Sequence, residues 1–462
     1  LDGRLANPTH PLWPFFESIH IISQPTFSSM YMAGQALFLA AGKILTGYFF
    51  GGVLLSTALF CAALTWFLRA SVPPGWAFYG GMLAAIRIGA ASYWNNSYWG
   101  GSVAALGGAL ALGAYLRLRK RWRPSTAFWF AIGVVLLANT RPYEGAGLSA
   151  VLCISLAWDF FRARDPRRWA ALAVALAVFA LAGWAMTRQF RAVTGNAFTL
   201  PYQVNQRAYG WPMTLPWSPV KKVEYRHPEF ELYREFEVKE HEYLNTTSLI
   251  PFGLFIKYSR WWRFFFGVGW SAVFLFTTPI LRTRRLRVIW IAAGVVFVMV
   301  ASEQTGYPHY LAPAAPAILL FAVMGLRYLA RSRFIAGPAM VRLIVPVWLA
   351  LLGVRAVALS PRTPPSTLPN FASWCCMDAR LRDRQPLLEK IAAQPGKHLV
   401  IVTYDLPSYD TFEWVYNEPD IDRSKVIWAR DMGPEKNREL LAYYPDRRVW
   451  HILIRNRHAI LQ

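Results

Sequence analysis

The chain has 462 residues, of which 55% are hydrophobic and only 16% are charged. Soluble globular domains usually carry about 25% charged residues, so the composition argues against a soluble protein. The net charge is +23, but the basic residues gather in short turns between apolar runs. Nucleic-acid binding would not produce that distribution, whereas the positive-inside rule of membrane proteins would.

Apolar runs that are long enough to cross a lipid bilayer recur along most of the chain. A span of about 20 apolar residues matches a hydrocarbon core of about 30 Å, and it must be helical so that its backbone polar groups bond within the segment. The sequence therefore predicts an all-α polytopic bundle of about 10 to 11 transmembrane helices. The predicted spans cover 50–69, 76–92, 98–116, 125–140, 145–161, 169–186, 262–281, 288–303, 311–326 and 338–358, and a further apolar helix covers 30–45.

Basic residues mark the turns on one side of this bundle. Clusters rich in arginine occur at 117–123, 162–168, 282–287 and 327–334, and the connections that alternate with them lack such clusters. Under the positive-inside rule the basic turns face the cytoplasm. We therefore expect an integral membrane protein, in a bacterial inner membrane, with the loop 187–260 and the C-terminal domain on the extracytoplasmic side.

The polar segments divide the chain into five parts. We predict an extracytoplasmic loop with the first apolar helix at 1–48, transmembrane helices at 49–186 and 261–359, a long extracytoplasmic loop at 187–260, and a small soluble α/β domain at 375–462. In the last part, apolar strands at 398–404, 425–431 and 447–454 alternate with helices at 379–394 and 434–444, which predicts a three-layer α/β sheet. No glycine-rich phosphate loop occurs there, so we expect an accessory or stabilising role.

The first group of candidate site residues lies in the segment 7–26, where His10, Glu17 and His20 stand among prolines and aromatic residues. Ionisable groups near membrane depth are costly and are often functional. These three residues are therefore candidates for substrate binding, with Glu17 as a candidate catalytic base. The alternative is an interfacial segment whose Trp13 and phenylalanines anchor at the lipid headgroups.

A second group is the sequence SYWNNSYWGG at 92–101. Aromatic faces stack on the C–H faces of sugars, and the amides of Asn95 and Asn96 suit hydroxyl groups. The alternative is an aromatic belt that closes with a tight turn.

A third group is the turn NTRPYEG at 139–145, which supplies Arg141, Tyr143 and Glu144. The fork of an arginine pairs well with phosphate oxygens. The alternative is an ion pair between Arg141 and Glu144 that closes a helical hairpin.

The fourth group is SEQTGYPHY at 302–310, where Glu303, His309 and Tyr310 meet at the end of a span. Proline there opens backbone groups toward a cavity, although a lone histidine is often only a satisfied polar group. All four groups are expected on the same side of the membrane. A shared cavity at that surface, capped by the loop 187–260, is the economical hypothesis.

These motifs together resemble those of a known superfamily of enzymes. The segment QPTFSSMYMAGQALFLAAGK at 24–43, the turn NTRPYEG, the segment HYLAP at 309–313 and the C-terminal domain are similar to the integral membrane glycosyltransferases of the GT-C fold. That superfamily includes the protein mannosyltransferases and the aminoarabinose transferases. The segment NP-HP at 7–11 and SYWNNSYWGG also resemble an uncharacterised bacterial branch of it.

The resemblance implies transfer of a sugar from a polyprenyl-phosphate-linked donor to an acceptor at the outer face. It implies that Arg141 is a phosphate partner and that His309 and Tyr310 line the donor site. In the family an acid after the first transmembrane helix acts as the base, and here that helix is expected upstream of Leu1, which leaves Glu17 as the fallback base.

Two other hypotheses stay open, a lipid or sugar transporter and a non-catalytic membrane scaffold. The expected partners are the polyprenyl-phosphate-sugar lipid, the membrane and an acceptor that is a lipid, a glycan or a protein. Nucleic acid is not expected. No cofactor and no metal site is assigned, because the cysteines and histidines lack metal-ligand spacing, and the need for a divalent metal stays open.

Overall fold

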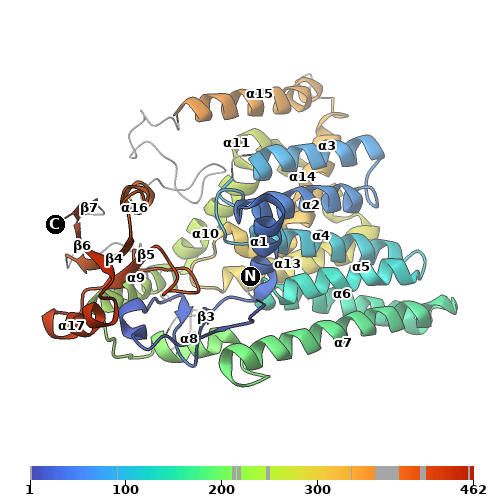
Figure 1. Ribbon diagram of the computed structural model, residues 1–462. Helices are drawn as coiled ribbons and strands as arrows, with labels where there is room; N and C mark the ends of the chain where they lie inside the picture. The colour runs from blue at the N-terminus through green and yellow to red at the C-terminus, as the bar shows by residue number, and fades with distance from the viewer. Residues whose placement is uncertain are drawn as a thin grey trace. The chain divides into compact units, whose positions relative to one another are not determined.

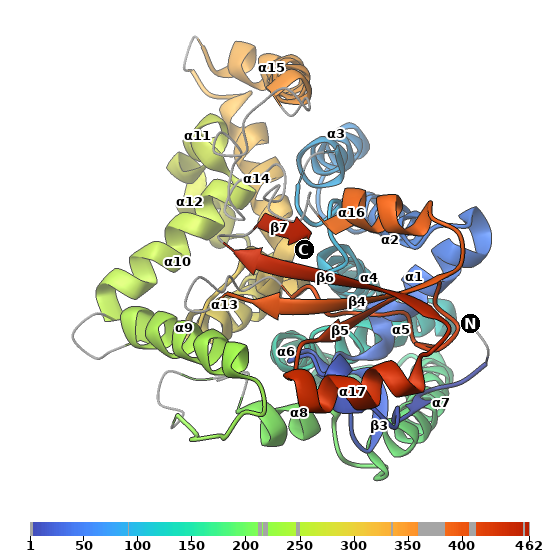
Figure 2. The same ribbon diagram turned by 60° about the vertical axis from the view of Figure 1, so that its left-hand side comes forward.

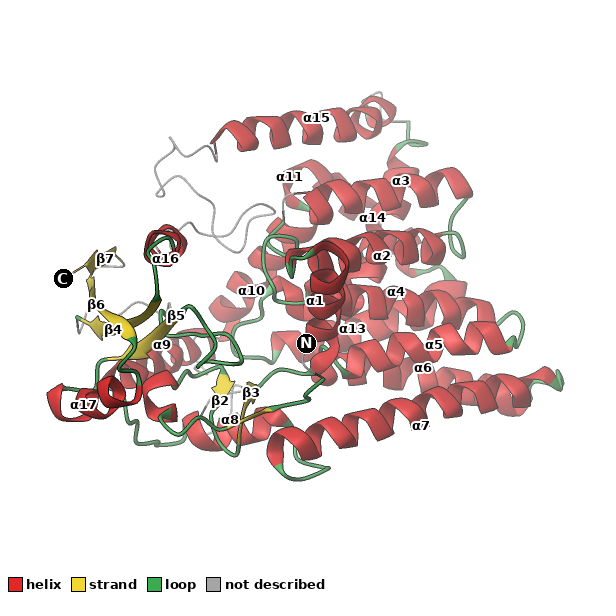
Figure 3. Cartoon of the chain, viewed as in Figure 1, coloured by secondary structure: helices red, strands yellow, loops and turns green. Residues whose placement is uncertain are grey.

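The computed structural model describes residues 3–90, 92–210, 215, 220–245, 250–333, 336–358, 384–405, 413–455 and 458–461. Its contacts divide the chain into two compact units. We call Leu1–Tyr31, Trp184–Thr246 and Ala379–Gln462 the mixed unit, and Met32–Gly183 and Thr247–Asp378 the helical unit. This grouping differs from the five predicted parts, because the N-terminal segment joins the long loop and the C-terminal domain. The described strands all belong to the mixed unit (Figure 3).

Apolar helices build the helical unit, as the composition predicts, and the last of its residues in the helix Arg167–Thr194 is Gly183, since Trp184–Thr194 belong to the mixed unit. They are α1 (Ala33–Thr46), α2 (Phe50–Leu68), α3 (Pro74–Ala84), α4 (Gly101–Leu118), α5 (Pro124–Ala138), α6 (Pro142–Arg162), α7 (Arg167–Thr194), α10 (Ile250–Phe265), α11 (Gly267–Trp270), α12 (Thr277–Leu281), α13 (Arg287–Ala301), α14 (Ala315–Leu329) and α15 (Gly337–Ala358). Short 3-10 segments cover Ser271–Phe276, Arg284–Leu286 and Pro308–Ala314, and a π-helical turn covers Ala85–Ala90.

Six of the described helices are long and apolar enough to cross a membrane. They are Phe50–Leu68, Gly101–Leu118, Pro142–Arg162, Arg167–Thr194, Pro308–Leu329 and Gly337–Val354. Shorter apolar helices occupy Ala33–Thr46, Pro124–Ala138 and Ser271–Leu281. The predicted fold class, a polytopic helical membrane bundle with a small α/β domain, is confirmed, although several of the predicted spans are shorter than a full crossing.

Small residues allow α4 to pack closely on its neighbours, and it lies between α2 and α5 (Figure 1). A Cβ added to Gly107 would lie 2.9 Å from the backbone oxygen of Gly133 on α5. A Cβ on Gly108 would lie 2.1 Å from the backbone oxygen of Pro313. Without the hydrophobic effect between helices in lipid, such close backbone approach is a main source of association.

One predicted span, 262–281, is not a continuous helix, and this prediction was wrong. The segment is divided into the end of α10, the short α11, a 3-10 segment and α12. Gly267, two residues after the end of α10, has a φ of 59°, a conformation that commonly ends helices. The buried Arg87 guanidinium also donates hydrogen bonds to the backbone oxygens of Arg263 and Phe264, where the last turn of α10 leaves them unpaired.

The mixed unit contains the C-terminal domain, whose sheet has the order β5-β4-β6-β7. The strands are β4 (Lys397–Tyr404), β5 (Val426–Arg430), β6 (Arg447–Arg455) and β7 (His458–Leu461), with β4 parallel to β5 and β6 and with β7 antiparallel to β6. Figure 2 shows α16 (Arg384–Ala392) and α17 (Pro434–Tyr443) on opposite faces of this sheet. The predicted three-layer sheet is therefore present; β7 was not predicted, and the first residues of the predicted helix 379–394 lie outside the described range.

Alternation along β4 explains the two layers. Leu399 and Ile401 pack with Leu440 of α17, whereas Val400 and Val402 pack with Ile391 of α16. Successive side chains of a strand point to opposite faces, so one apolar strand supplies both cores.

The N-terminal segment completes the core under α17. Phe15 and Phe16 are buried there beside Leu440, so they do not anchor at lipid headgroups, as the alternative interpretation held. The same segment forms a small sheet of order β1-β3-β2, made of Asn7–Pro8, Thr26–Ser29 and Ile21–Ile22. The predicted loop 187–260 contributes two helices to this unit, α8 (Pro201–Tyr209) and α9 (Pro228–Asn245).

Candidate functional site

Glu17 follows the short 3-10 helix Trp13–Phe16 and is buried in the mixed unit. Its Oε1 accepts a hydrogen bond from the Tyr209 hydroxyl at 2.8 Å, and its Oε2 lies 3.2 Å from Nε2 of His227 and 3.4 Å from Nε of Arg226. Burial raises the pKa of this carboxyl, but the hydrogen bonds from His227 and Tyr209 outweigh burial and hold the pKa below its ordinary value. Glu17 is therefore ionised at neutral pH, and its three polar neighbours lower its basicity.

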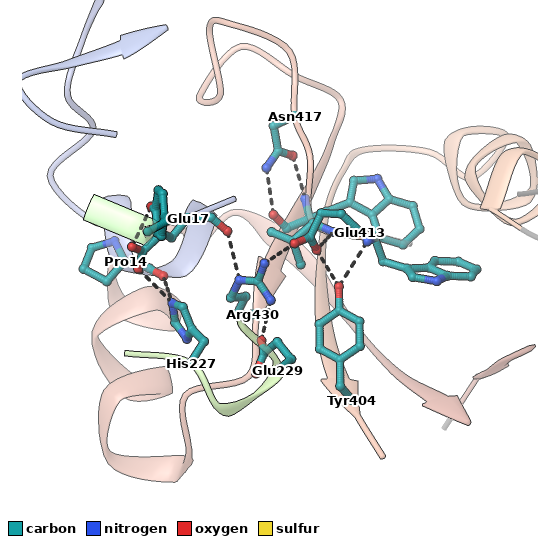
Figure 4. A network of polar contacts seen from close by, with 12 residues as sticks. Pro14, Glu17, His227, Glu229, Tyr404, Glu413, Asn417 and Arg430 are labelled. Atoms are coloured by element: carbon teal, nitrogen blue, oxygen red, sulfur yellow. Dashed lines mark hydrogen bonds and ion pairs between the residues drawn. The ribbon is translucent and has the colours of Figure 1, made fainter. Parts of the chain in front are cut away.

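Arg430 stands at the centre of a buried network that joins three distant segments of the mixed unit (Figure 4). Its Nε donates to the backbone oxygen of Glu17 at 2.9 Å. Its Nη1 and Nη2 donate to the carboxylates of Glu229 and Glu413, and Tyr404 donates its hydroxyl to the second oxygen of Glu413. The Arg430 side chain is 1% exposed, so a fully paired buried charge fixes the backbone that carries Glu17.

His10 is used in packing within the same unit. Its Nδ1 accepts a hydrogen bond from the backbone N–H of Leu12 at 2.9 Å. Its Nε2 therefore carries the proton, and it lies 3.2 Å from Asp422 Oδ1 and 3.2 Å from the Tyr444 hydroxyl. These contacts tie the N-terminal segment to the C-terminal domain.

His20, three residues after Glu17, lies among aromatic rings. Its Nδ1 is 3.2 Å from the Tyr31 hydroxyl, its ring stacks on that of Tyr31, and the ring of Tyr233 meets it edge-on. Burial lowers the pKa of His20 to about 4, against the opposing charge of Glu413. The imidazole is therefore neutral at neutral pH.

The helical unit brings together the arginine and the acid of the turn 139–145. Arg141 precedes α6 and Glu144 stands in its first turn, with Nη1 of Arg141 3.9 Å from Oε1 of Glu144. That distance exceeds a hydrogen bond, although it is within reach of electrostatic attraction. The Arg141 guanidinium also lies over the ring of Tyr310, 4.3 Å from its centre, so two predicted groups meet here.

His309 is held by Tyr93, a residue that the sequence did not single out. The Tyr93 hydroxyl accepts from the backbone N–H of His309 at 2.9 Å and lies 2.8 Å from Nδ1 of the same residue. The second contact is a hydrogen bond in which the hydroxyl donates to Nδ1 in one imidazole tautomer and accepts from it in the other. Both residues are buried.

Aromatic rings surround this histidine. The centroid of the His309 ring lies 5.0 Å from that of Trp99 and 4.6 Å from that of Tyr310. The Tyr307 ring stacks on it, with 5.8 Å between centroids. Trp99 is exposed, so the cluster reaches the surface of the unit. Aromatic faces of this kind offer stacking area to a sugar ring.

One face of α10 holds the loop that leads to His309. Lys257 donates from Nζ to the backbone oxygens of Ala301 and Glu303, Arg260 donates to that of Thr305 at 2.9 Å, and Trp261 donates to that of Gly306 at 2.6 Å. These three donors are spaced i, i+3 and i+4, so they share one face of the helix. These hydrogen bonds hold the segment from Ala301 to Gly306, which includes Glu303, against α10.

Two carboxylates in this region have unpaired oxygens. Within the described ranges, Oε1 of Glu144 and Oε2 of Glu303 are buried and lack a hydrogen-bond partner. The two acids are close enough to interact electrostatically with one another and with Arg141. Buried polar atoms are rarely left unpaired, which marks this cluster as the strongest candidate site in the helical unit.

The remaining predicted residues take different positions. Asn95 bonds locally, since its amide donates to the backbone oxygen of Gly89 and its Oδ1 accepts from Thr57 at 3.2 Å. Asn96 is exposed and Tyr143 is half-buried. Asn95 therefore serves the turn, while Asn96 stays accessible to a ligand.

Sequence reasoning missed Tyr93, Lys257 and Arg430. Tyr93 and Lys257 lie in aromatic or apolar stretches, where only their polar atoms mark them, and Arg430 ends a strand in an otherwise apolar run. A buried cation in an apolar segment is the signal that points to the last two. For the described residues, no group of three His, Cys, Asp or Glu side chains is placed to hold a metal ion.

Comparison with known proteins assigns no family to the chain. No family model matches the chain, and no curated protein matches its sequence. Among solved structures, that of ArnT from Cupriavidus metallidurans in the apo state is similar, with a TM-score of 0.44 and 12% sequence identity over 98% of this chain and 87% of that one.

Proposed function

We propose that the chain is a membrane glycosyltransferase that moves a sugar from a polyprenyl-phosphate-linked donor to an acceptor at the outer face. The observation that carries the proposal is the buried cluster of the helical unit. There Arg141 lies over Tyr310, beside Glu144 and Glu303, whose carboxylates keep unpaired oxygens within the described part of the chain. The cation suits a phosphate, the aromatic faces suit a sugar ring, and a carboxylate suits the proton of an acceptor hydroxyl.

In this proposal Arg141 binds the donor phosphate. A guanidinium can offer two parallel N–H donors to phosphate oxygens, and the ring of Tyr310 below it fixes the plane of the fork. The aromatic cluster around His309 then stacks on the sugar, with Asn96 as an exposed amide for its hydroxyls. His20, His10 and Tyr143 remain weaker candidates for contacts with the acceptor or the donor.

The reaction needs a carboxylate within reach of the acceptor hydroxyl. That hydroxyl would attack the anomeric carbon, its proton would pass to the carboxylate, and the bond between the anomeric carbon and the donor oxygen would break. The electron pair would leave with the polyprenyl phosphate, whose charge Arg141 stabilises. We propose Glu303 or Glu144 as the base, because each lies in the cluster with Arg141 and keeps a buried oxygen without a hydrogen bond in the described residues. Oε2 of Glu17 is also buried without a hydrogen bond there, but Glu17 is the weaker candidate because its polar neighbours hold its pKa below the ordinary value.

The proposed orientation in a bacterial inner membrane puts the basic turns 117–123, 162–168, 282–287 and 327–334 in the cytoplasm. The mixed unit would then be extracytoplasmic. Single cysteines in the turns, labelled from outside by an impermeant reagent, test this. Labelling of 282–287 from outside would overturn the orientation.

Donor binding tests the function itself. The full chain in nanodiscs should bind a polyprenyl-phosphate sugar at least about tenfold more tightly than the Arg141→Lys variant, which keeps the charge but lacks the fork. Arg119→Lys is a matched control, since Arg119 pairs with Asp159 at 2.7 Å in the same unit. Equal donor affinity in wild type and Arg141→Lys, with both folded, would contradict the proposed phosphate contact.

A further inference from the structure

Two basic turns of the helical unit pack against one another, the turn between α4 and α5 and the turn between α6 and α7. Arg119 of the first turn pairs with Asp159, near the end of α6, at 2.7 Å. The Trp122 ring meets that of Phe160 edge-on, with 5.7 Å between centroids. These contacts join two turns that are distant in the sequence into one surface. We call it the basic surface, and it comprises residues 119–123 and 158–169.

The basic surface holds many more cations than acids. Its acids are Asp159 and Asp165, and its cations are Arg119, Lys120, Arg121, Arg123, Arg162, Arg164, Arg167 and Arg168. Asp159 pairs with Arg119, and Asp165 accepts a hydrogen bond from the backbone N–H of Arg167 at 3.0 Å. Among the residues that the structure describes, the cations other than Arg119 form no ion pair, and all of them except Arg168 are exposed. Their charges are therefore open to an anionic partner.

Exposed aromatic rings adjoin these cations. Trp158 is 61% exposed, Phe161 is 81% exposed and Trp169 is 59% exposed. The Arg162 guanidinium lies over the ring of Trp158, 4.0 Å from its centre, and that of Arg168 lies 5.6 Å from the centre of Trp169. Both α6 and α7 are long and apolar enough to cross a membrane. Large rings beside cations at the ends of such helices are typical of the headgroup level, where the rings meet hydrocarbon and the cations meet phosphates.

We propose that the basic surface binds an anionic phospholipid, with the phosphate on its arginines and the acyl chains along its exposed rings. The positive-inside rule explains basic turns on one side of a membrane, but it does not require two turns to form one surface beside exposed rings. Clusters of about four to eight Lys and Arg beside a membrane helix attract acidic lipids, and arginine forks match phosphate oxygens. Arg141 precedes α6 and Arg162 ends it, so the proposal does not rest on sugar transfer.

Native mass spectrometry of the full chain in detergent measures this binding. Phosphatidylglycerol should bind wild type more tightly than phosphatidylcholine with the same acyl chains, because only the first carries a net negative charge. A triple variant with Arg121→Gln, Arg123→Gln and Arg164→Gln should lose about 100-fold in affinity for phosphatidylglycerol, since each cation near an anionic lipid contributes about fivefold. Its affinity for phosphatidylcholine and its Tm should match those of wild type, because the three side chains are exposed.

A second triple variant separates a local site from the effect of net charge. Arg331→Gln, Arg333→Gln and Arg342→Gln remove three exposed arginines of the same unit that lie outside the basic surface, and this variant should keep the wild-type affinity for phosphatidylglycerol.

The role of the acyl chains is tested by Phe161→Ser, which keeps every charge and should weaken the affinity for phosphatidylglycerol. Glycerol phosphate, which has the headgroup phosphate without the chains, should bind wild type more weakly than the lipid does. The proposal is overturned if both triple variants lose equal affinity, if wild type does not prefer phosphatidylglycerol to phosphatidylcholine, or if glycerol phosphate binds as tightly as the lipid.

Discussion

Two arginine clusters in this protein differ in how the neighbouring carboxylates are paired. In the mixed unit, Arg430 bonds through each guanidinium nitrogen to an oxygen of Glu17, Glu229 or Glu413. In the helical unit, Arg141 lies 3.9 Å from Glu144. There, within the described residues, one oxygen each of Glu144 and Glu303 is buried without a hydrogen bond.

The difference separates structure from function. A fully paired charge network specifies how segments join, and its strength depends on every member being present. An unpaired buried polar atom costs about 1 to 3 kcal/mol of folding free energy, so such atoms persist chiefly where a ligand supplies the partner. The Arg430 network is therefore expected to respond to mutation with loss of stability, and the Arg141 cluster with loss of binding.

The largest expected effect comes from Arg430→Met. The change leaves the carboxylates of Glu229 and Glu413 buried without their cation, and removal of one partner from a buried ion pair costs about 3 to 5 kcal/mol. The free energy of unfolding by denaturant should fall by that amount, and hydrogen exchange should rise in the N-terminal segment, in α9 and in the C-terminal sheet together.

Arg455→Met is the matched control for this comparison. Arg455 pairs with Asp405 at 2.5 Å in the same sheet, but the two side chains are 53% and 36% exposed. An exposed pair contributes about 0 to 1 kcal/mol. If the two variants lose equal free energy of unfolding, the buried Arg430 network does not stabilise the mixed unit more than an exposed ion pair does.

Glu17→Gln should have the next largest effect on stability. The amide loses the charge that accepts from the Tyr209 hydroxyl and lies 3.2 Å from Nε2 of His227, and hydrogen bonds to charged groups contribute about 1.5 to 3 kcal/mol. Because the folded-state pKa of Glu17 lies below its unfolded value, its contribution is present above the unfolded pKa and is lost as the pH falls through the folded one. Wild type should therefore lose stability in acid more steeply than Glu17→Gln, and parallel pH profiles of unfolding would contradict this.

Hydrophobic length predicted most of the helices but not their breaks. The predicted span 50–69 is the helix Phe50–Leu68, whereas 262–281 is broken after Phe265. The composition stays apolar through the break, so periodicity gave no sign of it. The break depends on Gly267 and on Arg87, which is distant in the sequence, and a contact of that range leaves no local signal.

The candidate sites show the same limit. Charge in an apolar context pointed to Arg141 and Glu144, which the structure places near Tyr310. The same reasoning grouped Glu17 with them, but it could not show that Arg430 holds the backbone of Glu17. A charged residue in an apolar span can be recognised from the sequence, whereas its hydrogen-bond partners from a distant segment cannot.

A smaller loss of stability is expected from Tyr93→Phe in the helical unit. The change removes the acceptor of the His309 backbone N–H and the hydrogen-bond partner of its Nδ1, which costs about 1 to 2 kcal/mol. Tyr98→Phe, at a position 53% exposed on the same turn, should change the free energy of unfolding by less than about 0.5 kcal/mol. Equal effects of the two substitutions would show that His309 does not depend on Tyr93.

The smallest effect on stability, and the sharpest contrast, is expected from Glu144→Gln. The substitution is chemically the same as Glu17→Gln, but Oε1 of Glu144 has no hydrogen-bond partner in the described residues to lose. Removal of its charge ends the attraction to Arg141 at 3.9 Å and also ends the cost of burying an ionised carboxylate, so the two changes oppose one another. The free energy of unfolding should change by less than about 1 kcal/mol, while affinity for a polyprenyl-phosphate sugar or the rate of transfer should change. If Glu144→Gln is instead as destabilising as Glu17→Gln and leaves donor affinity unaltered, Glu144 serves the helical hairpin, and the contrast between the two clusters fails.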